Sequence, residues 1–87
     1  MEESKYLKLA KEYSIKQWGF DIVLPAGEED GWHYFSCTRL NRPHYGSLPS
    51  AIRINSKGEV ESLEGYIMRS KVSRMAYKLR DMKNVPN

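Results

Sequence analysis

The segment at the centre of the chain, residues 32–38, reads Trp32-His33-Tyr34-Phe35-Ser36-Cys37-Thr38. Three aromatic rings and a β-branched last residue, without Gly or Pro, favour a β-strand. Successive side chains of a strand point to opposite faces, so Trp32 and Tyr34 share one face and Phe35 lies on the other. Because both faces carry a large ring, we expect this segment to be the central strand of a sheet.

Two elements are predicted before this strand. Over residues 4–18 the apolar side chains follow the i, i+3, i+4, i+7 spacing of an amphipathic helix, and Gly19 suits the left-handed residue that closes a helix. Residues 20–24 alternate as a first strand does, and Pro-Ala-Gly at 25–27 is expected to end it. The acidic turn at 28–31 then leads into the central strand.

Three further elements are predicted after it. Residues 39–49 contain two Pro, one Gly and two Arg, which indicates a long loop. Residues 51–54 and 59–63 flank the turn sequence Asn-Ser-Lys-Gly at 55–58, which is typical of a hairpin with a bulged type I turn. Apolar residues at helical spacing then predict a helix over 70–83, with a serine as its N-cap.

These elements define an α+β fold with the order helix, three- to four-stranded antiparallel sheet, helix, and we expect both helices to pack on one face of the sheet. Residues 1–87 make a single domain, and its tail at 83–87 is expected to fray. The side chains expected in the core are Leu9, Tyr13, Phe20, Ile22, Phe35, Ile52, Ile54, Val60, Val72, Met75 and Leu79.

Charge is distributed unevenly along the chain, whose net charge is +3. Residues 1–35 hold four lysines and seven acidic residues, whereas residues 36–87 hold ten basic and four acidic residues. Such asymmetry can indicate a nucleic-acid or acidic-protein partner, although folding can bring the two halves together. The single Cys37 cannot form an intramolecular disulfide, which favours a cytoplasmic location. Without a signal-peptide pattern or an apolar run near ~18 residues, we expect no membrane attachment.

The residue pattern does not favour catalysis or metal binding. His33 and Cys37 share a strand face but lie roughly 13 Å apart, too far for a direct Cys/His pair. Two histidines and one cysteine, without C-x-x-C or H-x-x-x-H spacing, are too few for a typical metal site. No Gly-rich phosphate loop is present in the sequence. We therefore expect no catalytic residue, no metal and no cofactor.

A non-catalytic module that binds another protein is our first functional hypothesis. Protein interfaces favour aromatic and arginine side chains, and a long ordered loop often carries function. The alternative for the loop is that it only connects two edges of the sheet. The identity of the partner and the oligomeric state stay open. The residues expected to contact the partner are Trp32, Arg39, Arg42, His44 and Tyr45.

The order of an aromatic strand, a loop, a proline, an apolar strand and a glycine hairpin resembles small bacterial immunity-type proteins. The segments that carry this resemblance are Trp32-His33-Tyr34-Phe35 and Pro49-Ser50-Ala51-Ile52-Arg53-Ile54-Asn55-Ser56-Lys57-Gly58-Glu59-Val60. The resemblance implies that the chain binds and blocks a toxin or another enzyme.

Nucleic-acid binding through the last helix is the alternative function. Residues 69–83 hold six basic residues against Asp81 alone, although a charged flank of this kind is often only a solvated surface. The helix-strands-helix order, with Ser70-Lys71 and Arg74 opening the last helix, resembles the double-stranded-RNA-binding domain, which implies that these basic side chains grip phosphates. The residues expected to bind nucleic acid are Arg69, Lys71, Arg74 and Lys78.

Overall fold

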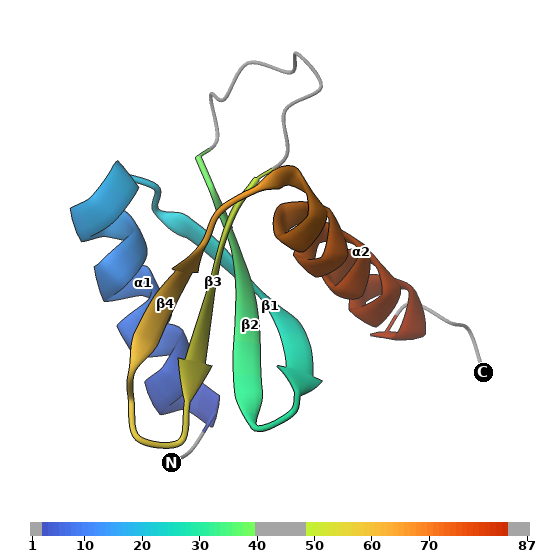
Figure 1. Cartoon of the computed structure of the whole chain (residues 1–87), viewed down its shortest axis with the longest axis horizontal. Coiled ribbons are helices and arrows are strands. Elements are labelled where there is room, and N and C mark those ends of the chain that lie inside the picture. Colours follow the sequence, from blue (N-terminus) through green and yellow to red (C-terminus); the bar gives the residue numbers. More distant parts are fainter. Residues whose placement is uncertain (1–2, 40–48, 84–87) are drawn as a thin grey trace.

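The described residues form six elements, in the order predicted from the sequence. They are α1 (Glu3–Trp18), β1 (Ile22–Glu29), β2 (Trp32–Thr38), β3 (Ser50–Asn55), β4 (Val60–Leu63) and α2 (Tyr66–Lys83) (Figure 1). The computed structural model describes residues 3–39 and 49–83, and the side chains of residues 5–39 and 49–79. Most of the predicted loop, residues 40–48, and residues 84–87 of the predicted tail lie outside the described residues.

The four strands form one antiparallel sheet with the order β1-β2-β3-β4. The prediction that residues 32–38 lie inside the sheet is confirmed, because Phe35 of β2 lies opposite Pro25 of β1 and Ile52 of β3. The predicted hairpin joins β3 to β4. Its turn is closed by the Asn55 side-chain oxygen, which accepts two backbone N–H groups at 3.0 Å each.

β1 is longer than the sequence pattern predicts. The expectation that residues 25–27 end this strand is wrong, because pairing with β2 continues to Glu29 through a bulge between Pro25 and Gly27. A proline is tolerated in an edge strand, where its missing N–H faces outward, and a bulge absorbs the irregular backbone. Gly27 has a φ of +124°, and a Cβ built there would lie 3.6 Å from the Met75 methyl carbon.

One face of the sheet packs against α1. The buried side chains here come from α1 and from the first three strands, and they are Tyr6, Ala10, Val23, Phe35, Cys37, Ile52 and Ile54. His33, on the same face of β2 as Phe35, stacks on the Tyr6 ring with 3.8 Å between centroids. Val60 of β4 packs against this cluster and lies opposite Ile54 of β3.

The opposite face packs against α2. The buried side chains of this second cluster are Ala26, Tyr34, Ala51, Leu63 and Val72, with Trp32, Met68, Met75 and Ala76 packed around them. α2 lies mainly over β1 and β2 (Figure 1).

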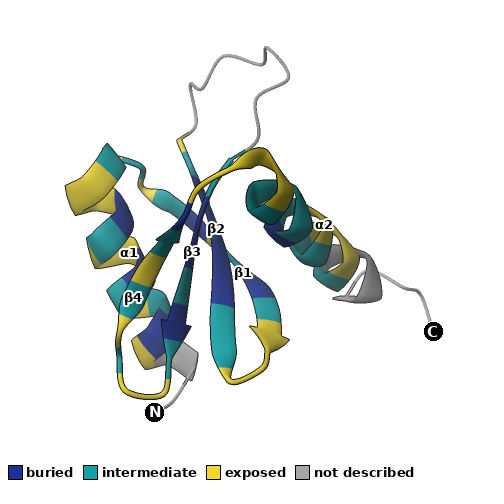
Figure 2. Ribbon diagram, in the orientation of Figure 1, coloured by how far each residue is buried: buried dark blue, intermediate teal, exposed yellow. Residues whose placement is uncertain are grey.

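The prediction that both helices pack on one face is therefore wrong. Tyr34 and Phe35 are neighbours in β2 and point to opposite sides, yet both are buried, at 4% and 2% exposure. Tyr34 belongs to the cluster with α2, and Phe35 belongs to the cluster with α1. The burial of both rings requires a cover on each side of the sheet, and one helix supplies each cover (Figure 2).

α2 begins earlier than predicted. Ser70 is not the N-cap, because the helix starts at Tyr66 and the Gly65 carbonyl already accepts the Arg69 N–H at 3.2 Å. Gly65, with a φ of +93°, therefore occupies the N-cap position, where glycine is well tolerated.

The end of α1 agrees with the prediction that Gly19 closes the helix. Gly19 has a φ of +74°, and its N–H donates to the Ile15 carbonyl at 2.9 Å. The buried Ser14 hydroxyl donates to the Phe20 carbonyl at 2.8 Å, which fixes the path of the chain into β1.

Of the predicted core, Phe35, Ile52, Ile54 and Val72 are fully buried, and the other predicted members are half-buried. Among the described residues, no helix is both long enough and apolar enough to span a membrane.

Candidate functional site

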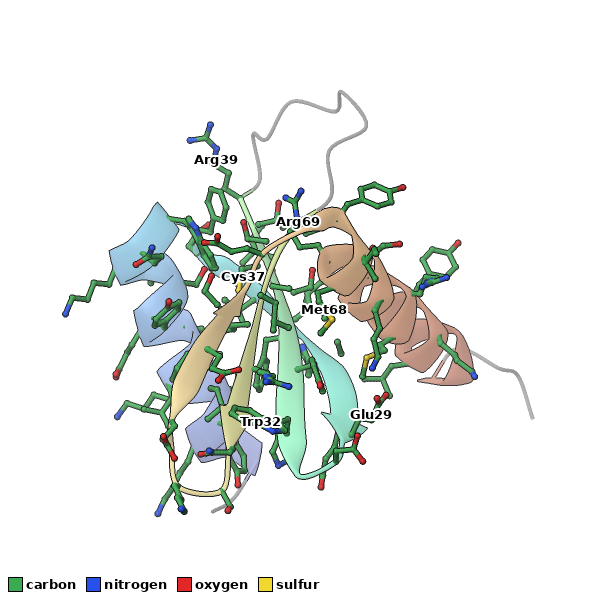
Figure 3. The ribbon with its side chains drawn as sticks, viewed as in Figure 1. Glu29, Trp32, Cys37, Arg39, Met68 and Arg69 are labelled. Carbon is green, nitrogen blue, oxygen red and sulfur yellow. The ribbon has the colours of Figure 1, made fainter. Side chains whose placement is uncertain are left out.

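The residues predicted to contact a protein do not form one site in the described part of the chain. Trp32 begins β2 and Arg39 follows its other end, so the two lie roughly 23 Å apart along the strand (Figure 3). Arg39 is exposed and Trp32 is half-buried. The other three predicted contacts, Arg42, His44 and Tyr45, lie outside the described residues.

Trp32 belongs to an ordered cluster on the α2 side of the sheet. The Arg53 guanidinium lies 4.0 Å above the Trp32 ring centroid, a cation–π contact. Arg53 also binds the carboxylate of Glu61, its cross-strand partner in β4, at 2.6 Å from Nη2 and 2.7 Å from Nε. Hydrogen bonds with Tyr34 and Glu61 raise the pKa of Arg53. The cluster therefore presents a tryptophan and an arginine in a fixed arrangement.

Lys71 of α2 is paired with the sheet at the protein surface, and its side chain is 37% exposed. Its ammonium lies 2.6 Å from the Glu29 carboxylate at the end of β1 and 5.9 Å from the Tyr34 ring centroid. The hydrogen bond to Glu29 raises the pKa of Lys71, and the charges of Glu29, Tyr34 and Asp30 act in the same direction. The acidic turn and the start of the basic helix thus neutralise each other at this point.

The four basic residues predicted to bind nucleic acid consequently differ in their surroundings. Arg74 and Lys78 are exposed, whereas Lys71 is paired with Glu29. Arg69 is half-buried and lines a cavity of about 250 Å³ between the sheet and the ends of the two helices. Side chains that bind a row of phosphates must face solvent. Of the four predicted residues, Arg74 and Lys78 are the two that are exposed.

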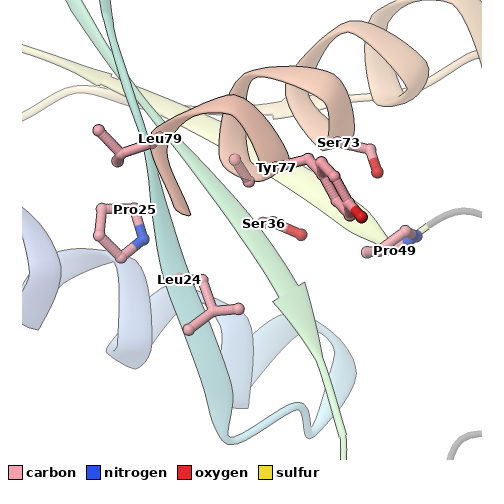
Figure 4. Close-up of a pocket in the computed structure, with 8 residues that line it drawn as sticks. Leu24, Pro25, Ser36, Pro49, Ser73, Tyr77 and Leu79 are labelled. Carbon is pink, nitrogen blue, oxygen red and sulfur yellow. The ribbon is translucent and has the colours of Figure 1, made fainter. Parts of the chain in front are cut away.

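A groove that the sequence did not indicate lies between β1 and α2. Its volume is about 280 Å³, and its lining residues are Leu24, Pro25, Ser36, Pro49, Ser73, Ala76, Tyr77 and Leu79 (Figure 4). Leu24 and Tyr77 are 46% and 67% exposed, so the groove opens to solvent between two large apolar side chains. Tyr77 lies away from the side of α2 on which Val72 and Met75 pack against the sheet.

The groove is chemically uniform. None of the described lining residues is charged, and the polar side-chain groups among them are the hydroxyls of Ser36, Ser73 and Tyr77. The sequence did not indicate Leu24 as a site residue, because the sequence of an edge strand does not show whether an apolar side chain will be covered by a helix or left open to solvent. The available signal was the position of Tyr77, which falls outside the apolar stripe of its helix.

Among the described residues, the groups that could serve catalysis do not form a reactive arrangement. Burial raises the pKa of the Cys37 thiol, and the hydrogen bond with Ser14 opposes this shift only in part. The imidazole Nε2 of His33 lies 3.7 Å from the Glu28 carboxylate, and its ring is stacked on Tyr6. Within residues 3–39 and 49–83, no group of three or more His, Cys, Asp or Glu side chains is placed to hold a metal ion.

Comparisons with models of protein families, with curated proteins and with solved structures give no match for this chain. The function must therefore be inferred from the chain's own residues.

Proposed function

We propose that this chain is a non-catalytic module that binds another protein through the open groove between β1 and α2. The observation that carries the proposal is the position of Leu24 and Tyr77, two large exposed side chains that border a concave surface whose described lining residues are uncharged. Exposed apolar side chains gathered around a hollow are typical of protein interaction sites.

The size of the groove fits side chains of a partner better than a separate small molecule. At about 280 Å³ it lies just below the range of roughly 300–1,000 Å³ that is usual for small-molecule pockets. One or two apolar side chains inserted from a partner would fill it, and such inserted anchors supply much of the affinity of an interface.

The Trp32–Arg53 pair is a second candidate contact, roughly 13 Å along β2 from Ser36 of the groove. Both side chains lie on the same sheet face as the groove, and Glu61 holds Arg53 in place. Tryptophan and arginine are the residue types most enriched among energetically dominant contacts. Pro49 lines the groove, so the predicted contacts at positions 42, 44 and 45 lie only a few residues away along the chain.

A blocking role of the immunity type is the specific form of this proposal, with an enzyme or toxin as the bound partner. One support is the resemblance of the aromatic strand and the glycine hairpin to small bacterial immunity-type proteins. The other is that, among the described residues, Cys37 and His33 have no neighbours that form a reactive arrangement with them. The single cysteine, which is buried, suits action in the cytoplasm.

The test is affinity capture from a lysate of the source organism with the chain immobilised. A double variant, Leu24→Ser/Tyr77→Ser, should lose a partner that the wild-type chain retains. Ile15→Ser is the matched control, because Ile15 is 55% exposed on α1, which packs against the other face of the sheet. A partner retained equally by the double variant would contradict the assignment to the groove.

Nucleic-acid binding stays the alternative, and the exposure of Arg74 and Lys78 favours it. The neutralisation of Lys71 by Glu29 and the acidic turn beside it work against it. An amide-resolved NMR titration with duplex RNA and duplex DNA at low salt separates the two functions. Shifts confined to residues 69–83 that weaken as salt rises would support nucleic-acid binding, and their absence would exclude it.

A further inference from the structure

We propose that an acidic amphipathic helix of the partner docks along the outward face of α2. It lies on a strip of this helix formed by Tyr66, Ser70, Ser73 and Tyr77. This inference rests on the proposed protein-binding function and names the element with which the partner binds. Because Ser73 and Tyr77 also line the groove, the strip and the groove are continuous, and one partner can cover both.

Helical periodicity places the four residues of the strip on one line. Ser70, Ser73 and Tyr77 follow Tyr66 by four, seven and eleven residues, and eleven residues are close to three full turns. The two tyrosines therefore lie on the same side of the helix, roughly 16.5 Å apart along its axis. Met75, which packs against the sheet, lies about half a turn away from this line.

The strip combines two exposed rings with two small residues between them. Tyr66 is 71% exposed and Tyr77 is 67% exposed. Ile67, at 79%, is a third large apolar side chain of this helix that is open to solvent. Large apolar side chains gathered on one exposed element are typical of interaction sites. The short side chains of the serines leave room between the rings for the backbone of a partner to approach.

The spacing of the strip favours a helix as the docking element. Steps of four, three and four residues form the contact line between two packed helices, because they keep successive side chains on one side of α2. A partner helix that follows this line contacts both rings within about eleven of its own residues. It would present apolar side chains at a spacing of three and four residues, as helices that bind other proteins commonly do.

The charge beside the strip specifies the chemistry of that helix. Arg74 lies four residues after Ser70 and three before Tyr77, so it is their neighbour on the helix surface. Arg74 is exposed, and none of the described side chains pairs with it. The side chains that are described in α2, those of residues 66–79, include no carboxylate. A carboxylate on the partner helix supplies this counter-charge and fixes the orientation of the helix.

A second copy of this chain suits the surface less well than a different protein. Residues 69–83 hold six basic residues against Asp81 alone, so two copies of α2 packed face to face would bring like charges together. A partner helix with carboxylates keeps the apolar contacts and replaces this repulsion with attraction.

The experiment is a selection against the immobilised full chain. The probe is a phage-displayed library of a small three-helix domain in which the outward face of one helix is randomised. The enriched helices should combine apolar residues at a spacing of three and four with Asp or Glu beside them. An enriched domain is then titrated against variants of the chain whose folding is checked by circular dichroism. Tyr66→Ser should weaken binding about tenfold, as expected for an anchor contact. Arg74→Glu should weaken it about fivefold.

Each variant has a matched control away from α2. Ile15→Ser removes an apolar side chain that is 55% exposed on α1, and Lys57→Glu reverses one exposed charge in the turn between β3 and β4. We expect either control to weaken binding less than about twofold. Equal losses from Arg74→Glu and Lys57→Glu would overturn the acidic helix, because attraction would then depend on net charge alone. Enriched helices without Asp or Glu would overturn it as well.

The outcomes separate this inference from the proposed function. Domains that lose affinity on Leu24→Ser but not on Tyr66→Ser would overturn docking along α2 and leave groove binding standing. If no domain is enriched, or none depends on Leu24, Tyr66 or Tyr77, both proposals are overturned. A dimer of the free wild-type chain in light scattering, dissociated by Tyr66→Ser/Tyr77→Ser, would overturn the choice of a different protein in favour of a second copy.

Discussion

Val72→Ala is the substitution that most directly tests the packing of α2 against the sheet. Val72 is fully buried in the cluster with Tyr34 and Leu63. The change removes two methyl groups, at about 0.8 kcal/mol each, and the unfilled space adds about 1 kcal/mol. The higher helix propensity of alanine returns about 0.5 kcal/mol. We therefore expect the free energy of unfolding to fall by about 2 kcal/mol, a large share of the ~4–13 kcal/mol typical of a chain this long.

The assay is urea denaturation followed by circular dichroism. With a slope of about 1–1.5 kcal/mol per molar, the midpoint should fall by about 1.3–2 M. Ile67→Ala is the matched control, because Ile67 lies on the same helix at 79% exposure and the substitution removes more atoms. We expect its effect to be within about 0.5 kcal/mol.

Two results would refute the reasoning. One is a loss of less than about 0.5 kcal/mol for Val72→Ala, and the other is an equal loss for Ile67→Ala. Nuclear Overhauser contacts offer an independent check, because the Tyr34 ring should show contacts to α2 and the Phe35 ring to α1. Contacts from both rings to the same helix would contradict the two-sided arrangement.

Three further predictions concern β1, the buried thiol and the Glu29–Lys71 ion pair. Gly27→Ala should destabilise the fold by about 1–3 kcal/mol in urea denaturation, because the φ of +124° strains any residue with a Cβ; an unchanged midpoint would argue against the bulge. Cys37 should react with a thiol reagent only when the chain unfolds. Because its pKa is raised in the folded state, stability should decrease as the pH rises above the ordinary thiol pKa of about 8.5 toward the raised value. The Cys37→Ala variant should lack this loss of stability at high pH. If the free energy of unfolding of the variant and of the wild-type protein varied with pH in the same way, the burial of Cys37 would be contradicted. Glu29→Gln should lower the pKa of Lys71, as measured by NMR titration of its side chain. The stabilising effect of this ion pair should be present at neutral pH and lost as the pH rises through the raised pKa of Lys71, and an unchanged pKa in the variant would show that the pair does not form in solution.

Much of the local structure could be predicted because it depends on neighbours in the sequence. The aromatic strand around Tyr34 and Phe35, the hairpin at Asn55 and the helix end at Gly19 all follow from patterns within a few residues. The predictions of local structure were wrong where one sequence pattern is compatible with two structures. Pro25 was interpreted as a strand end, although an edge strand with a bulge also accepts proline.

The predicted site was harder to obtain, because a surface joins residues that are distant in the sequence. Leu24 and Tyr77 meet at the groove only because α2 crosses the sheet over β1 and β2. Likewise, the basic flank of the last helix looked uniform in the sequence. Contact with Glu29 neutralises Lys71, however, while Arg74 and Lys78 remain exposed.

The sequence alone determined the order of the elements, the central place of β2 and the presence of a large ring on each of its faces, since strand geometry sends Tyr34 and Phe35 to opposite sides. It did not predict that each face has its own helix. Only the tertiary structure decided which helix covers which ring and which apolar residues stay uncovered. The physical reason is that the alternation of side chains along a strand distinguishes its two faces but does not determine which helix will pack on each face. That choice depends on the connections and on the packing of the whole chain, and it places the groove beside α2.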